Sequence, residues 1–128
     1  MRLLLDTHIF LWFVSGDTKL SKTAHEAIVD AENVVLLSVA SLWETIIKYD
    51  LGKLPLPESP TTYIPRQRES HLIESLPINE SSLGKLAGLP RIHSDPFDRF
   101  LVSQALAADL TVVTSDGDIP KYDVKTLI

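Results

Sequence analysis

The stretch LLLDTH, residues 3 to 8, decides the fold that the rest of the chain must accommodate. Three consecutive leucines are typical of a strand that is buried on both faces, as the strands of parallel sheets are. An acidic residue, Asp6, follows directly at the end of this predicted strand. An acid at that position either caps the helix that comes next or belongs to a functional site, and both interpretations fit the sequence.

Predicted strands and helices alternate along the whole chain. The apolar, β-branched segments that predict strands are residues 2–5, 33–38, 75–78, 111–115 and 122–128. Periodic apolar spacing predicts helices at residues 7–14, 22–32, 39–54, 61–74, 79–89 and 95–110. The last helix has the strongest signal, because Asp95 is a good N-cap and Pro96 suits the first helical position. This alternation predicts an α/β sandwich around a mainly parallel, five-stranded sheet.

Length and composition limit the possible classes of protein. A chain of 128 residues without a Pro- or Gly-rich linker fits a single domain, residues 1–128. No segment is long enough to span a bilayer, and Asp6 and His8 interrupt the only run that resembles a signal peptide. The chain has no cysteine, which excludes disulfides and Cys-ligated metal sites and agrees with a cytoplasmic location. A net charge of −5 disfavours non-specific nucleic-acid binding.

Acidic residues recur where the predicted parallel strands end. Ligand sites in such sheets lie outside the carboxyl ends of the strands, so acids in these segments are expected to converge. One acid follows the first strand, one lies in the helix after the second, two begin the last helix, and two follow the fourth strand. In chain order they are Asp6, Glu44, Asp95, Asp98, Asp116 and Asp118.

Each of these acids, taken singly, also has a structural explanation. Ser41 and Glu44 match the spacing of a capping box, in which the glutamate only closes the start of a helix. Asp98 lies in a first turn, where the helix dipole favours negative charge. Asp116 belongs to SDGD, a composition typical of turns. Convergence of all of them on one edge favours a functional interpretation.

Several carboxylates in one crevice repel each other unless a cation neutralises them. Oxygen ligands without cysteine, and with few histidines, are the set that Mg²⁺ or Mn²⁺ prefers. The sequence therefore predicts a magnesium or manganese site, with Asp6 as a ligand at the end of the first strand.

Four motifs in order give the chain a resemblance to PIN-domain proteins of the VapC toxin type, found in bacterial toxin–antitoxin pairs. The motifs are LLLDTHIFLW at 3–12, SVASLWETIIKYDLGKL at 38–54, HSDPFDRFLVSQA at 93–105 and VVTSDGDI at 112–119. The resemblance covers the whole chain. It implies a three-layer α/β/α sandwich and a metal-dependent endoribonuclease that hydrolyses RNA. It also implies a homodimer and a small antitoxin partner that commonly inserts a basic side chain into the acidic pocket.

The same resemblance implies an acidic quartet of catalytic metal ligands: Asp6, Glu44, Asp98 and Asp116. Asp6 and Asp98 would hold the main metal ion, and the other two would orient its waters or complete a second site. Asp98 matches the third acid of the family better than Asp95, which then remains an N-cap. Hydroxyls of Thr7 and of Thr114 or Ser115 would bond the carboxylates.

Other side chains receive narrower expectations. Lys48, Arg91 or Arg99 would contact phosphates of the RNA. The histidines His8 and His93 are interpreted as structural rather than as general bases. Trp12 and Trp43 fall among apolar residues and are expected in the core or an interface. The apolar runs 9–14 and 51–57 are candidate surfaces for the partner protein.

Three other classes of protein share part of the pattern. A receiver domain needs paired acids after the first strand and a lysine after a late one, and both are missing. A phosphatase of the haloacid dehalogenase type needs a second aspartate two residues after Asp6, where this chain has His8. A catalytically idle binding module of the same fold stays open, because the sequence does not measure activity.

Overall fold

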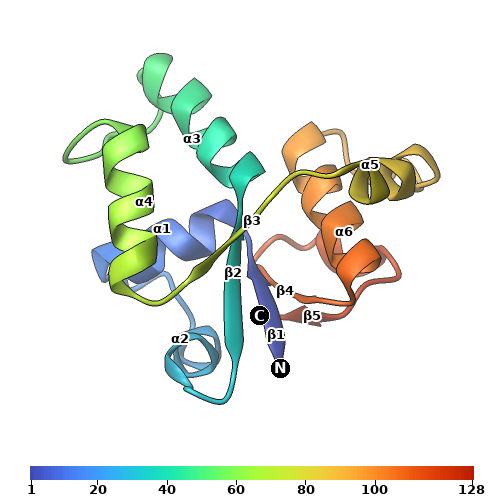
Figure 1. Cartoon of the computed structure of the whole chain (residues 1–128), viewed down its shortest axis with the longest axis horizontal. Coiled ribbons are helices and arrows are strands. Elements are labelled where there is room, and N and C mark those ends of the chain that lie inside the picture. The colour runs from blue at the N-terminus through green and yellow to red at the C-terminus, as the bar shows by residue number, and fades with distance from the viewer.

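A computed structural model describes all residues, 1–128, and contains one five-stranded sheet with every neighbouring pair parallel. The strand order is β3-β2-β1-β4-β5, with the LLL strand in the centre (Figure 1). A strand in that place is covered on both faces, which explains the unbroken run of leucines. The strands are β1 (Arg2–Leu5), β2 (Val34–Ser38), β3 (Glu74–Leu76), β4 (Thr111–Val113) and β5 (Thr126–Leu127).

Helices connect successive strands and lie on both faces of the sheet (Figure 1). They are α1 (Thr7–Ser15), α2 (Lys22–Val29), α3 (Val39–Asp50), α4 (Pro60–Ser70), α5 (Glu80–Ala87) and α6 (Pro96–Ala108), with a short 3₁₀ helix at Ile119–Lys121. No helix is long and apolar enough to cross a membrane.

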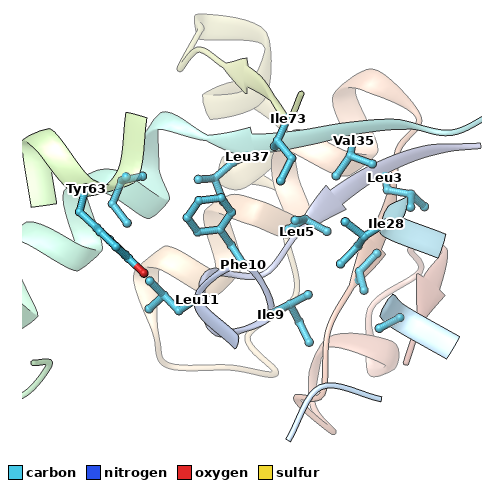
Figure 2. Packing of buried hydrophobic residues seen from close by; sticks show 13 residues of the cluster. Leu3, Leu5, Ile9, Phe10, Leu11, Ile28, Val35, Leu37, Tyr63 and Ile73 are labelled. Atoms are coloured by element: carbon cyan, nitrogen blue, oxygen red, sulfur yellow. The ribbon is translucent and has the colours of Figure 1, made fainter. Parts of the chain in front are cut away.

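The pleat of the strands divides the buried side chains into two cores. Leu3 and Leu5 point to one face and pack with α1, α2 and α4, as Figure 2 shows. Leu4 points to the other face and packs with α6 and with Ile119. Successive side chains of a strand face opposite sides of a sheet, so one LLL segment serves both cores. The predicted three-layer α/β/α sandwich is therefore confirmed.

The predicted elements are all present, but several end elsewhere. Helix α3 stops at Asp50, before Gly52, whose φ of +71° suits glycine and ends the helical turn. Helix α4 begins at Pro60, so Pro65 lies inside the helix rather than near its first turn. The predicted strand at 75–78 begins and ends earlier, because main-chain pairing with β2 runs from Glu74 to Leu76. The 3₁₀ helix was not predicted.

The connections reverse direction at β1. From β1 the chain adds β2 and then β3 on one side of the sheet. Helices α5 and α6 then lead the chain back to the other side of β1, where β4 and β5 are added. The crevice between β1 and β4 is thus the topological switch point, where sheets of this kind bind ligands. Asp6 follows β1 and Asp116 follows β4, so both lie beside that crevice.

We propose that residues 1–128 form a single domain, because one sheet and its two cores draw on both ends of the chain. A single cooperative unfolding transition, seen alike by two spectroscopic probes, would support this.

Candidate metal centre at the switch point

An acidic pocket of about 250 Å³ lies at the carboxyl end of the sheet. Its lining comes from segments far apart in the sequence, and only one of the lining residues is hydrophobic. The lining residues are Asp6, His8, Trp12, Glu44, Lys48, Asp95, Asp98, Ser115 and Asp116. The four acids of the predicted quartet are therefore neighbours, whereas Asp118 is not part of the lining.

Asp6 lies at the N-cap position of α1 but makes no side-chain capping bond. Its carboxylate instead accepts a hydrogen bond of 2.8 Å from the Thr114 hydroxyl, which follows β4. Its main-chain N–H donates to the carbonyl of Val113 at 2.9 Å and extends the pairing of the two strands. The capping interpretation of Asp6 is thus wrong, and the side chain faces the pocket.

Glu44 is not part of a capping box. Helix α3 begins three residues earlier than that interpretation requires, with Ser38 as N-cap accepting from the N–H of Ala40. Glu44 therefore lies inside the helix, where its buried carboxylate accepts from the Thr7 hydroxyl at 2.8 Å. It also pairs with Lys48 Nζ at 2.5 Å, one helical turn further on. These bonds provide the partners that a buried charge requires.

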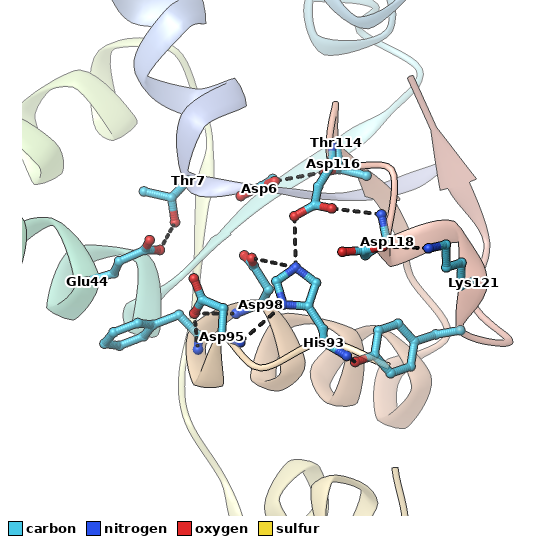
Figure 3. Close-up of polar contacts among 12 residues, drawn as sticks. Asp6, Thr7, Glu44, His93, Asp95, Asp98, Thr114, Asp116, Asp118 and Lys121 are labelled. Carbon is cyan, nitrogen blue, oxygen red and sulfur yellow. Dashed lines mark hydrogen bonds and ion pairs between the residues drawn. The ribbon is translucent and has the colours of Figure 1, made fainter. Parts of the chain in front are cut away.

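Asp95 and Asp98 have different roles at the start of α6. Asp95 is the N-cap, and its carboxylate accepts from the main-chain N–H groups of Phe97 and Asp98. This cap holds the first turn, from which the Asp98 side chain points toward the pocket (Figure 3). The sequence-based division between a capping acid and a pocket acid agrees with this geometry.

Asp116 is fixed by the loop after β4 and by a histidine (Figure 3). Its main-chain N–H donates to Thr114 Oγ1 at 2.9 Å, and its Oδ1 accepts from the N–H of Asp118 at 2.8 Å. Its Oδ2 lies 2.9 Å from Nε2 of His93, and that nitrogen is also 3.3 Å from Asp98 Oδ2. The hydroxyl of Thr114 thus links Asp6 to Asp116.

The proximity of the carboxylates shifts their proton affinities. Burial, with the charges of Asp6, Asp95 and Glu44, raises the pKa of Asp98 from 3.8 to about 7. Burial also raises the pKa of Asp6, although the Thr114 hydroxyl opposes this effect. At Asp116 burial acts in the same direction, but the bond from His93 and the N–H of Asp118 outweigh it and lower the pKa. Asp98 therefore holds its proton to a higher pH than an ordinary aspartate does.

The donor set fits a hard divalent cation. The groups that face the pocket are mainly carboxylate oxygens, and such oxygens are the ligands of Mg²⁺ and Mn²⁺. One oxygen each of Asp98 and Asp116, together with a nitrogen of His93, lie within 4.8 Å of one another. Asp6 and Glu44 lie outside that close group but line the same pocket. A cation would also offset the charges of Asp6, Asp95 and Glu44, which add to the effect of burial on the pKa of Asp98.

The contacts of four residues around the pocket could not be predicted from the sequence. His93 bonds Asp116, and its main-chain N–H donates to the Tyr122 hydroxyl at 2.9 Å; the sequence indicates neither contact. Trp43 is 56% exposed and contacts Phe97, which excludes the core and leaves the interface that was expected as the alternative. Arg99 donates to the carbonyls of Leu89 and Pro90. Arg99 is not among the residues that line the pocket.

Replacement of Asp98 by Asn tests, through stability, the raised pKa that burial and the neighbouring carboxylates give Asp98. The folded protein holds the Asp98 proton more tightly than the unfolded chain, since its pKa is about 7 instead of 3.8. The stabilisation from that proton is complete below about pH 4 and is lost as the pH rises through about 7. In a chelator, the melting temperature of Asp98→Asn should fall less than that of wild type between about pH 5 and pH 8.

A matched control is Asp109→Asn, because Asp109 is exposed and lies at the far end of α6 in the left-handed conformation, which Asn also tolerates. Its melting curve should follow that of wild type. Parallel pH profiles for Asp98→Asn and wild type would contradict the raised pKa of Asp98.

Comparisons with known proteins agree with this geometry. Residues 3–125 match the PIN domain model. A stretch of 38 residues is 53% identical to Ribonuclease VapC16 of Mycobacterium tuberculosis (strain ATCC 25618 / H37Rv), over 30% of this chain and 27% of that relative. The chain thus matches about a quarter of the length of this curated relative.

Two solved structures share the fold. VapBC2 from Rickettsia felis, bound to a DNA fragment from their promoter, superposes with a TM-score of 0.73 at 16% identity, covering 99% of this chain and 98% of that one. FitAcB from Neisseria gonorrhoeae superposes with a TM-score of 0.66 at 18% identity, covering 98% and 96%. At these identities the likeness concerns the fold, and the family model, which matches nearly the whole chain, decides the classification: the chain belongs to the PIN-domain family.

Proposed function

We propose that this protein is a metal-dependent endoribonuclease, the toxin of a toxin–antitoxin pair, whose site is the acidic pocket at the switch point. The observation that carries the proposal is the convergence of Asp6, Glu44, Asp98 and Asp116 on one pocket at the end of the central strands. The PIN family model and the local identity to a ribonuclease support the choice of RNA as substrate. We expect the enzyme to act in the cytoplasm, where its substrate would be met.

Asp6 and Asp98 are the proposed principal ligands of Mg²⁺ or Mn²⁺, with Glu44 and Asp116 completing the site. Such an ion activates water at neutral pH and stabilises the charge that develops on a phosphodiester under attack. The hydroxyls of Thr7 and Thr114 keep Glu44 and Asp6 oriented, because each donates to one carboxylate.

Lys48 is the proposed contact to the RNA backbone. It lines the pocket with a partly exposed ammonium group, although Glu44 already accepts from it. The Glu44 bond raises the pKa of Lys48 despite its partial burial, so the group stays charged at neutral pH. A charged lysine at the rim of an acidic pocket can hold a phosphate beside the metal ligands.

A small antitoxin is the proposed partner. The runs 9–14 and 51–57, expected to supply a partner surface, both contribute to one surface hollow of about 400 Å³ next to the acidic pocket. His8 and Trp12 line both hollows. A chain seated there could reach the carboxylates with a basic side chain. A co-expressed antitoxin that binds wild type but leaves the pocket open to RNA would contradict this arrangement.

Cleavage of RNA by the purified, partner-free protein tests the activity. We expect cleavage with Mg²⁺ or Mn²⁺, none with a chelator, and a loss on the order of 100-fold or more in Asp98→Asn, because a charge-stabilising group is removed. Asp109→Asn is the matched control and should cleave like wild type. Full activity in the chelator, or in Asp98→Asn, would contradict the proposed site.

A folded wild type that binds the metal ion yet cleaves no member of a broad RNA pool would favour the idle binding module. That second candidate has no observation in its favour beyond the fold itself.

A second copy of the chain is the proposed occupant of an apolar hollow of about 420 Å³ between α3, α5 and α6. Trp43 and Phe97, which line it, directly precede the pocket residues Glu44 and Asp98 in sequence, so a partner seated there would border the acidic site. Exposed apolar surfaces of this kind commonly mark protein interfaces.

Trp43→Glu tests the dimer, because it puts a charge into the lining of that apolar hollow. Sedimentation equilibrium should show a dimer for wild type and a monomer for the variant, with unchanged circular dichroism. The matched control is Val29→Glu, at an exposed position at the end of α2, and it should leave the dimer intact. A monomeric wild type, or a dimeric Trp43→Glu, would contradict the assignment of this face.

A further inference from the structure

We propose that His93 is a positioning residue, which keeps its proton on Nε2, donates it to Asp116 and thereby holds this carboxylate beside Asp98. The imidazole would orient the proposed metal ligands without being a ligand itself. This inference rests on the proposed function only in taking Asp98 and Asp116 as metal ligands. The state of the histidine can be tested without any metal ion.

The geometry around Nε2 suits a donor. This nitrogen lies 2.9 Å from Asp116 Oδ2 and 3.3 Å from Asp98 Oδ2, and the histidine side chain is only 13% exposed. A nitrogen that carries a proton can bond one of these oxygens and remain close to the other. Without the proton, its lone pair would face two carboxylates and repel both.

The other ring nitrogen determines the tautomer. Nδ1 lies 3.1 Å from the main-chain N–H of Asp95, and an amide N–H can only donate. Nδ1 must therefore offer a lone pair, and the single proton of a neutral imidazole then resides on Nε2. A metal-ligating Nε2 would need the proton on Nδ1, where it would oppose the Asp95 N–H. The group of His93, Asp98 and Asp116 is consequently a hydrogen-bonded support rather than a three-ligand metal site.

The backbone of His93 is held by a buried tyrosine. Its N–H donates to the hydroxyl of Tyr122 at 2.9 Å, and Tyr122 is buried in the core that contains α6 and β4. Asp95 thus has two functions, since its carboxylate caps α6 while its N–H orients the imidazole. His93 therefore connects the start of α6, which carries Asp98, to the loop after β4, which carries Asp116.

Nitrogen NMR of the metal-free protein, labelled with ¹⁵N-histidine and held at mildly alkaline pH, tests the tautomer directly. Long-range proton–nitrogen correlations distinguish protonated from bare ring nitrogens, and the His93 signal is assigned by its loss in His93→Gln. We expect the proton on Nε2, both before and after addition of Mg²⁺. A proton on Nδ1, or a transfer to Nδ1 when Mg²⁺ is added, would overturn the proposal and make His93 a ligand.

Two variants test the consequence through Mn²⁺ affinity, measured as free Mn²⁺ by electron paramagnetic resonance. The amide of His93→Gln can still donate to Asp116, so its affinity should match that of wild type. His93→Leu cannot donate, and its affinity should fall by about 10- to 100-fold, as is usual when a residue that orients metal ligands is lost. His25→Leu, on the exposed side of α2, is the matched control and should bind like wild type.

The outcomes separate this inference from the proposed function. Wild-type affinity in His93→Leu would overturn the positioning role, and so would an equal loss in Gln and Leu variants that keep their fold. If wild type binds no Mn²⁺ at all, the proposed metal site fails, and the NMR result alone then decides whether His93 holds Asp116.

Discussion

Mutual repulsion among carboxylates that the parallel sheet forces into one pocket is the constraint on which the rest of the site depends. The carboxyl ends of β1, β2 and β4 meet at the same edge, so acids that follow them cannot avoid each other. The start of α6 adds Asp98 from the other layer. The cost appears in the pKa of Asp98, which burial and neighbouring charges raise to about 7. Groups that reduce this cost therefore surround the pocket.

Three kinds of contact reduce the repulsion within the chain. Hydroxyls donate to two of the acids, from Thr7 to Glu44 and from Thr114 to Asp6. Lys48 neutralises Glu44 from the next turn of the same helix. His93 bonds Asp116. Asp98 has the fewest such partners, and a divalent cation between the carboxylates would supply what it lacks. The charge balance of the pocket and the proposed chemistry thus both favour a divalent cation.

Local patterns predicted the frame of the molecule well, because its physical causes are local. The leucines of residues 3–5 are typical of a strand buried on both faces, and Asp95 with Pro96 is typical of a helix start. The position of Asp6 followed from the same reasoning, since it depends on where one strand ends. The choice of four acids from six needed the family resemblance, and their roles as ligands stay a prediction.

Contacts between distant segments could not be predicted from one sequence. His93 bonds Asp116 and Tyr122, which lie 23 and 29 residues away, and only the folded loop brings them together. The apparent capping box at Ser41 failed because Ser38 caps α3 first. The apolar neighbours of Trp43 in sequence left core and interface open, and the exposure of its side chain excludes the core. Hydrophobic character alone did not distinguish a core from an exposed apolar surface.

Titration calorimetry of the metal-free protein with Mn²⁺ near neutral pH, in two buffers with different ionisation enthalpies, tests the central claim most directly. If burial and the neighbouring carboxylates hold a proton on Asp98, the ion must displace it, because metal ligands bind deprotonated. The measured heat should then differ between the buffers by an amount that corresponds to proton release. Absence of binding, or equal heats in both buffers, would contradict a pocket whose crowded acids await a cation.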